Sequence, residues 1–285
     1  MAITKFIPQV WSAALLEHFK SGQYVIPTLN RQYEGEARKG NVVKVTAITT
    51  PSVQDYAAAG RTLTIDALAD TQQDILIDQE KAIAFKVDDI DRVQAAGSFE
   101  PVTRDAGHAL AEDAEQFAIA QLLAGGTSAG TTAPTDFDSA FAVVSTLREN
   151  LTKAKVPSAS RFLVVNPEFA SLLLSGEGKL TSVDAAGSAG ELRNGVIGRL
   201  LGFTVIEHPG FDEDAPSAIG YHGPSAAFIS QIDKVEAGRM ELSFADYIRA
   251  LNVYGGKVLR STAVQTWIGA PAAGGGDDEG TGGGE

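Results

Sequence analysis

Apolar residues recur at helical spacing in several parts of the chain. This pattern predicts a short amphipathic helix within residues 8–19 and a second helix over residues 136–155, for which an early Asp can serve as the cap. The strongest pattern lies in "RDAGHALAEDAEQFAIAQLLA" and predicts a long helix over residues 104–124. A short helix is expected after Asn166, with Pro167 at its first position.

Strand patterns separate and follow these helices. "NVVKVTAI" (41–48) predicts a strand that is entered through a glycine. The continuous apolar run "RFLVVN" (161–166) is typical of a strand buried on both faces. Three further stretches near the end of the chain predict strands that return to the body of the molecule: "KVEAGRMELSF", "ALNVYGG" and "KVLRSTAVQTWIG". Alternation of helix and strand over residues 136–232 indicates a compact α/β lobe.

Residues 61–90 have apolar positions with strand alternation and a second face made of Thr, Asp and Lys. A pair of half-polar strands joined by "ALADTQQ" predicts an extended hairpin that projects from the body. Such a hairpin is only marginally stable alone. It would gain stability by lying on something else.

Glycines at 195, 198 and 202 precede the apolar run "FTVIEH". They do not spell G-x-G-x-x-G, and a dinucleotide loop follows a strand instead of preceding one. The stretch "ELRNGVIGRLLGFTVIEHPGF" therefore predicts a helix, a turn at Gly202 and a core strand. "GGTSAGTTAPT" (125–135) predicts a flexible break.

The composition narrows the classes of function. The chain has 285 residues and a net charge of -13, which gives it no general electrostatic reason to grip nucleic acid or an anionic membrane. It has no cysteine, so disulfides and thiolate nucleophiles are excluded. No apolar run has the length of a membrane span, and we expect neither a signal peptide nor a membrane partner. The last residues, rich in Gly and Asp, predict a disordered tail.

The motifs that could carry catalysis or bind a metal lack their required context. "GTSAG" places Ser128 in a G-x-S-x-G spelling, but a helix precedes it and a loop follows it. The four histidines are scattered, and the acidic runs "DDID" (88–91) and "EDAE" (112–115) lack the glycine and alternating ligands of a calcium loop. A solvated face is the expectation for each acidic run. No catalytic, cofactor-binding or metal-binding residue is predicted.

The order and spacing of three soft motifs resemble a known family. They are "YEGEARKGNVVKVTAI" (33–48), "DILIDQEKAIAFKVDDIDRVQA" (74–95), and the series from "RFLVVNPEFASLLL" through "ELRNGVIGRLLGFTVIEHPGF" to "AIGYHGPSAAF" and the following strands. Together they cover residues 33–267. The chain resembles a tailed-phage major capsid protein of the HK97-like fold, in the P22-coat-like branch that is common among phages of actinobacteria.

The resemblance implies an α+β subunit that forms pentamers and hexamers of an icosahedral shell around double-stranded DNA. It implies assembly in the bacterial cytoplasm with a portal and, because the chain begins almost at once with the arm, a separate scaffolding protein. By position only, we expect interface charges at Arg61, Lys86, Glu236 and Arg239. The implied division is an N-terminal arm (1–55), an extended loop (56–90), a spine helix with peripheral domain (91–135), an axial domain (136–232), return strands of the peripheral domain (233–270) and a tail (271–285).

Two alternatives stay open at the level of sequence. An encapsulin, the shell of a cellular compartment, would have the same fold and hold enzyme cargo. A soluble α/β enzyme with an unrecognised site would instead form a small closed oligomer with a ligand pocket.

Overall fold

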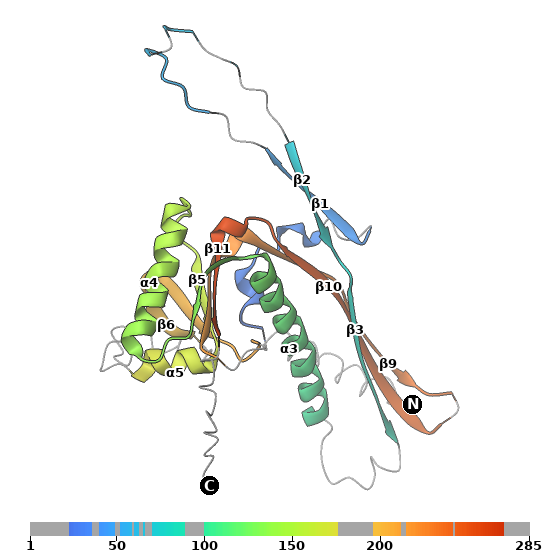
Figure 1. The fold of residues 1–285 in the computed structure, drawn as a ribbon. Helices are drawn as coiled ribbons and strands as arrows, with labels where there is room; N and C mark the ends of the chain where they lie inside the picture. The colour runs from blue at the N-terminus through green and yellow to red at the C-terminus, as the bar shows by residue number, and fades with distance from the viewer. Residues whose placement is uncertain are drawn as a thin grey trace, which may run out of the picture.

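Three sheets and three α-helices form the part of the chain that the structure describes (Figure 1). This computed structural model describes residues 23–35, 40–48, 52–58, 60–62, 65, 70–88, 100–175, 196–211, 215–241 and 243–270. Its elements are η1 (Ile26–Thr28), β1 (Val42–Ile48), β2 (Asp70–Leu76), β3 (Gln79–Asp88), α3 (Glu100–Gly125), β4 (Thr127–Thr132), α4 (Phe137–Lys153), β5 (Arg161–Val165), α5 (Pro167–Ser175), β6 (Val196–Leu200), β7 (Phe203–Glu207), β8 (Ser217–His222), β9 (Ala226–Arg239), β10 (Ala245–Val258) and β11 (Val264–Ala270).

A six-stranded mixed sheet, in the order β4-β11-β8-β5-β7-β6, forms one half of the body. Helices α4 and α5 cover one face, and η1 with the C-terminal half of α3 covers the other. Strand β5 is apolar on both faces: Leu163 and Val165 join the cluster with α4 and α5, whereas Val164 joins the cluster with α3. The strand predicted at 161–166 and its burial on both faces are confirmed.

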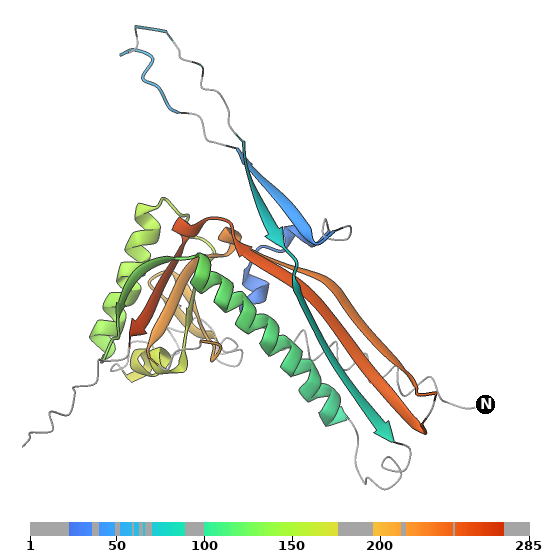
Figure 2. The same ribbon diagram turned by 45° about the vertical axis from the view of Figure 1, so that its right-hand side comes forward.

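A long antiparallel sheet, in the order β3-β10-β9, forms the other half. The N-terminal half of α3 lies against it, where Leu110 and Ala111 pack with Ile248 and Ala250 of β10. Helix α3 therefore contacts both sheets and lies between them in Figures 1 and 2. The long helix predicted at 104–124 is confirmed, and it connects the six-stranded sheet to the three-stranded sheet by packing on both.

The starts of α4 and α5 follow from side-chain capping, as the sequence predicted. Asp136 accepts the backbone N–H of Ser139 at 2.8 Å in a capping box at α4. Asn166 accepts the N–H of Phe169 at 3.0 Å, and Pro167 is the first residue of α5. Pro is tolerated there because the first N–H groups of a helix have no partner within the helix.

Strands β1 and β2 form the hairpin that projects from the body, with Ile48 opposite Asp70 (Figures 1 and 2). The prediction of a separate hairpin within residues 61–90 is therefore wrong, because β2 pairs with β1 and β3 pairs with β10. Ile75 and Ile77 explain the difference: both are buried in one cluster, so the chain stays extended from β2 into β3 instead of turning back.

Residues 196–200, expected at the end of a helix, are strand β6 of a hairpin with β7. Leu201 and Gly202 form the turn, with φ of 50° and 88°. A two-residue hairpin loop of this kind needs positive φ at both positions, so the predicted turn at Gly202 is confirmed. The prediction of a helix before this turn is wrong, because the periodicity of a short apolar run cannot distinguish a helix from a strand.

Residues 127–132, expected in a flexible break, form β4 and pair in parallel with β11 at the sheet edge. A Cβ atom at Gly130 would lie 2.4 Å from the Trp267 ring, so the glycine lets β4 approach β11 closely. The helix predicted at 8–19, the tail at 271–285 and residues 89–91 of the first acidic run lie outside the described residues.

Candidate functional site

The base of the β1–β2 hairpin is fixed to the body by apolar and polar contacts. Val43, Ile75 and Ile77 are buried against β9 and β10. The Gln73 side-chain amide donates to the Leu259 carbonyl at 3.1 Å, and the Ile77 N–H donates to the Asn41 carbonyl at 2.8 Å, which closes the hairpin at its base. The hairpin therefore leaves the body in a defined direction.

Gly255 of β10 permits the closest approach of this hairpin to the body. A Cβ atom there would lie 2.0 Å from the Leu76 carbonyl oxygen and 2.8 Å from the Ile77 Cα. Both neighbours are backbone atoms, so any side chain would displace the end of β2. The lack of a side chain at Gly255 is a packing requirement of the hairpin base.

The distal part of the hairpin carries apolar side chains in solvent. Val53 is fully exposed, Ile65 is 94% exposed and Tyr56 is 51% exposed. Exposed apolar side chains that gather in one segment are a feature of surfaces that bind other molecules. Arg61, one of the four expected interface residues, lies in this same exposed segment with a positive φ of 62°.

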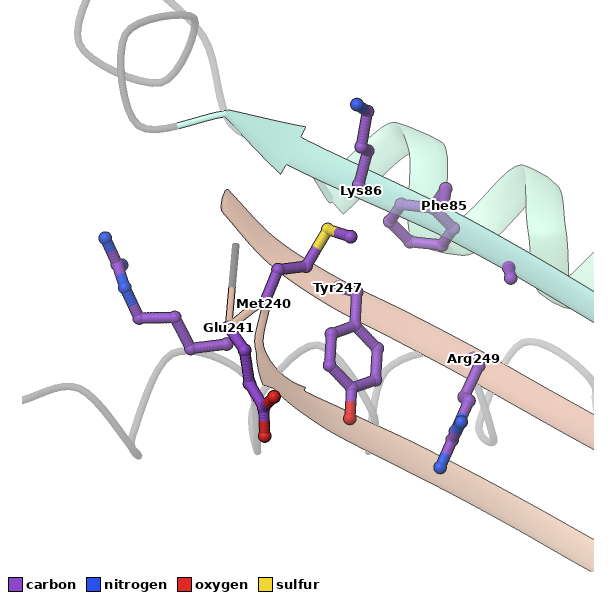
Figure 3. A pocket seen from close by; sticks show the side chains of 8 residues that line it. Phe85, Lys86, Met240, Glu241, Tyr247 and Arg249 are labelled. Atoms are coloured by element: carbon purple, nitrogen blue, oxygen red, sulfur yellow. The ribbon is translucent and has the colours of Figure 1, made fainter. Parts of the chain in front are cut away.

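The other three expected interface residues lie together at the far end of the long sheet, away from the hairpin. Lys86 lies opposite Tyr247, Arg239 lies opposite Asp246, and Glu236 lies opposite Arg249. Lys86 and Arg239 help to line an open pocket of about 690 Å³ (Figure 3). The residues that line it are Ala84, Phe85, Lys86, Arg239, Met240, Glu241, Tyr247 and Arg249.

Two of the expected interface residues, Glu236 and Arg239, already have charged partners within the chain. Arg249 donates from Nε to Glu236 at 2.7 Å, and this hydrogen bond together with the negative charge of Glu236 raises the pKa of Arg249. Arg239 Nη1 lies 3.5 Å from Asp246 Oδ1. Figure 3 shows Tyr247 and Arg249 extending from β10 across β9. These contacts fix the side chains of Glu236 and Arg239 on the sheet.

Glu115 of α3 is the polar residue whose position the sequence interpretation missed. It belongs to the "EDAE" run that was expected on a solvated face, yet its side chain is 0% exposed. It accepts backbone N–H groups from Tyr24, Val25 and Ile26. The spacing carried a signal, because Glu115 falls on the same helical stripe as the buried Ala111 and Leu122.

Ser128 and the three described histidines, His108, His208 and His222, lie on separate elements: β4, α3, the end of β7 and β8. His208 is buried and lies 3.8 Å from Glu115, which no sequence motif indicated. Ser128 is exposed near the start of β4. Among the described residues there is no group of three or more His, Asp or Glu side chains that could hold a metal ion. No described helix is both long enough and apolar enough to cross a membrane.

Comparison with known proteins identifies the family. A family model described as phage capsid protein matches residues 72–267. A solved chain from Mycobacterium phage Che8 is 48% identical to this chain, with a TM-score of 0.74. That match covers 87% of this chain and 92% of the phage chain. No curated protein sequence matches this chain.

More distant structures share the fold. The capsid of Cyanophage P-SCSP1u is 13% identical with a TM-score of 0.64, and the match covers 82% of this chain and 85% of that one. A virus-like particle from Pyrococcus furiosus is 15% identical with a TM-score of 0.62, and the match covers 92% of this chain and 99% of that one.

The family match spans more than half of the chain, and the likeness to the mycobacteriophage chain extends over nearly all of it. The resemblance stated from the sequence and the α+β fold of HK97 type are confirmed. The role of the protein is structural, and the protein is located in the virion capsid. The chain belongs to the phage capsid protein family and is a major capsid protein that associates with itself into a shell.

Proposed function

We propose that copies of this chain form the pentamers and hexamers of an icosahedral shell that encloses double-stranded DNA. The observation that carries the proposal is the projecting β1–β2 hairpin, between whose strands Val53 and Ile65 are exposed (Figure 1). A neighbouring copy would bury these side chains. Burial of apolar surface, repeated at every subunit, would stabilise the shell.

The net charge of the protein supports a shell that encloses the DNA without binding it tightly. The net charge of -13 disfavours contact with phosphates, which normally dominate the affinity of a protein for nucleic acid. The DNA would therefore be confined by the shell and not bound by sequence.

The four charged residues remain proposed interface positions in two separate places. Arg61 would act from the projecting hairpin, whereas Lys86, Glu236 and Arg239 would act from the far end of the long sheet. Because Glu236 and Arg239 already have partners in their own chain, their role would be to hold that end of the sheet in shape for a neighbour.

The proposed division of the chain differs in two respects from the expectation of the sequence. The extended loop would comprise β1, β2 and the residues that join them, so the arm would end before β1, and β3 would belong to the peripheral domain. The spine helix, the axial domain, the return strands and the tail keep their proposed places. A separate scaffolding protein and a portal would act during assembly in the host cytoplasm, and the chain would have no enzymatic activity and need no cofactor.

Imaging by electron microscopy tests this proposal. The chain is expressed alone and with candidate scaffolding partners, and the particles are purified and examined for nucleic acid and protein content. Closed shells, and DNA within shells from infected cells, are the expected result. Shells that hold an enzyme would support the encapsulin alternative, whereas only small oligomers with a saturable ligand site under every condition would overturn the shell proposal.

A further inference from the structure

The carboxylate of Glu115 receives three backbone donors from one short segment. Oε1 accepts from Tyr24 N at 3.0 Å and from Ile26 N at 2.9 Å, and Oε2 accepts from Val25 N at 2.8 Å. The three donors are consecutive residues at the start of η1, where backbone N–H groups have no partner within the helix. The side chain of Glu115, which lies 89 to 91 residues later in the chain, thus accepts hydrogen bonds from all three of these backbone N–H groups.

Apolar packing fixes the same segment to the six-stranded sheet. Val25 and Ile26 are fully buried with residues of α3 and β8. Thr28 Oγ1 lies 2.5 Å from the Tyr221 hydroxyl of β8. A Cβ atom at Gly223 would lie 2.4 Å from the Thr28 carbonyl oxygen, so the segment rests directly on the chain that follows β8. The segment, α3 and the sheet therefore meet at one point.

Within the described part of the chain, no Lys or Arg side chain forms an ion pair with Glu115. The titratable groups that face this junction within the described residues are His208, Tyr221 and Glu112. His208 Nδ1 accepts the Gly210 N–H at 2.9 Å, so the neutral ring carries its proton on Nε2, which lies 3.8 Å from Glu115. An unpaired buried charge is very unfavourable, and here only the three N–H groups and this neighbouring ring moderate it.

We propose that Glu115 is a two-state latch that holds residues 24–26 on α3 and against the six-stranded sheet. When the latch is closed, the Glu115 carboxylate accepts hydrogen bonds from the N–H groups of residues 24–26. When it opens, the three hydrogen bonds are lost together, and the carboxylate and the N–H groups must form hydrogen bonds with water instead. Docking of this segment is therefore all-or-none and independent of whether copies associate, so the inference goes beyond the proposed shell function.

Hydrogen exchange of the isolated chain tests the latch directly. Glu115→Gln keeps the size of the side chain but turns one acceptor oxygen into a donor that faces a donor. We expect the amides of residues 24–26 to exchange at least about tenfold faster in Glu115→Gln, because hydrogen bonds to a charged group are lost. The matched control is Glu112→Gln, one turn earlier on α3, in which these amides keep the rate of the unsubstituted chain.

An equal exchange rate at residues 24–26 in Glu115→Gln and Glu112→Gln would overturn the latch, whatever the outcome for shell assembly. A uniform rise in exchange over the whole chain would also overturn it, because a latch opens locally. If Glu115→Gln does not fold, Glu115→Asp carries the same test with the same criterion, since it keeps the charge on a side chain that is one methylene shorter.

Discussion

The six-stranded layer and the projecting hairpin use apolar residues in opposite ways. In the layer, the side chains of α4, α5 and the sheet bury one another within a single subunit. In the hairpin, only the base is buried, and Val53 and Ile65 lie in solvent. The layer therefore provides the stability of the subunit, and the difference fits the proposal that a neighbouring copy covers the hairpin.

Removal of a core side chain in the layer is the strongest test of this contrast. Leu147 of α4 is fully buried, and Leu147→Ala should lower the free energy of unfolding by about 2–5 kcal/mol because it leaves a cavity. Equilibrium denaturation in urea measures the loss. Ile65→Ala is the matched change in the hairpin: it should leave the unfolding of the subunit unchanged and weaken assembly. A large loss of stability in Ile65→Ala would contradict the contrast.

A methyl group at the hairpin base should have the next largest effect. Gly255→Ala forces a Cβ atom against the Leu76 carbonyl and should cost about 1–3 kcal/mol, with faster hydrogen exchange in β1 and β2. The control is Gly256→Ala, whose nearest contact is the Ala227 carbonyl at 3.1 Å, so it should perturb the base less. Equal effects of the two changes would show that the hairpin base is not packed as described.

The pH dependence of stability should separate the two buried titratable groups at the latch. Burial lowers the pKa of His208, so the unfolded chain binds a proton first and stability should fall as the pH drops below 6.5. Burial raises the pKa of Glu115, and its three hydrogen bonds offset this rise only in part. The ionised carboxylate of the latch therefore still has a net desolvation cost, and the effect on stability has the opposite sign: stability is higher at low pH and falls as the pH rises through the raised pKa.

Thermal denaturation of the unsubstituted chain and His208→Gln from about pH 7.5 to about pH 5.5 distinguishes these contributions. His208→Gln should lose less stability on acidification than the unsubstituted chain, since the His208 contribution is removed, whereas His222, whose pKa burial also lowers, contributes equally in both proteins. An identical pH profile for the two proteins would mean that His208 is not buried in its neutral form.

The ion pair between Glu236 and Arg249 should have the smallest effect on the isolated subunit. Arg249 is 60% exposed and Glu236 is 32% exposed on the long sheet, and ion pairs in contact with solvent contribute little. Arg249→Gln should change the melting temperature by no more than about 1 °C. A greater reduction of assembly in Arg249→Gln than in Arg31→Gln, whose pair with Glu34 is also exposed, would support the role of this surface between copies.

The sequence predicted the parts of the fold that depend on local patterns. Helix α3 and strand β5 have long or continuous apolar patterns, and Asp136 and Asn166 cap helices that begin beside them. Strand pairing is not local, which is why β2 was assigned to the wrong partner. The half-polar pattern of residues 61–90 fits either partner, and only the joint burial of Ile75 and Ile77 at the body determines it.

The buried position of Glu115 could be predicted only in part. Its place on the apolar stripe of α3 was available in the sequence, but its partners are backbone groups of a segment some 90 residues earlier, and backbone donors have no residue type to recognise. Likewise, the proposed interface charges could be named by position, but their partners on β10 depend on the register between β9 and β10.

Excision of the distal hairpin tests the central claim, that this chain builds a shell through the projecting β1–β2 hairpin, most directly. Residues 49–69 are replaced by Asn-Gly, which can close Ile48 onto Asp70 in a two-residue turn. Electron microscopy of the purified protein is the measurement, with the melting temperature as a check on folding. We predict a folded subunit with an unchanged melting temperature that forms no closed shells under conditions in which the intact chain does. Normal shells from the excised chain would contradict the account.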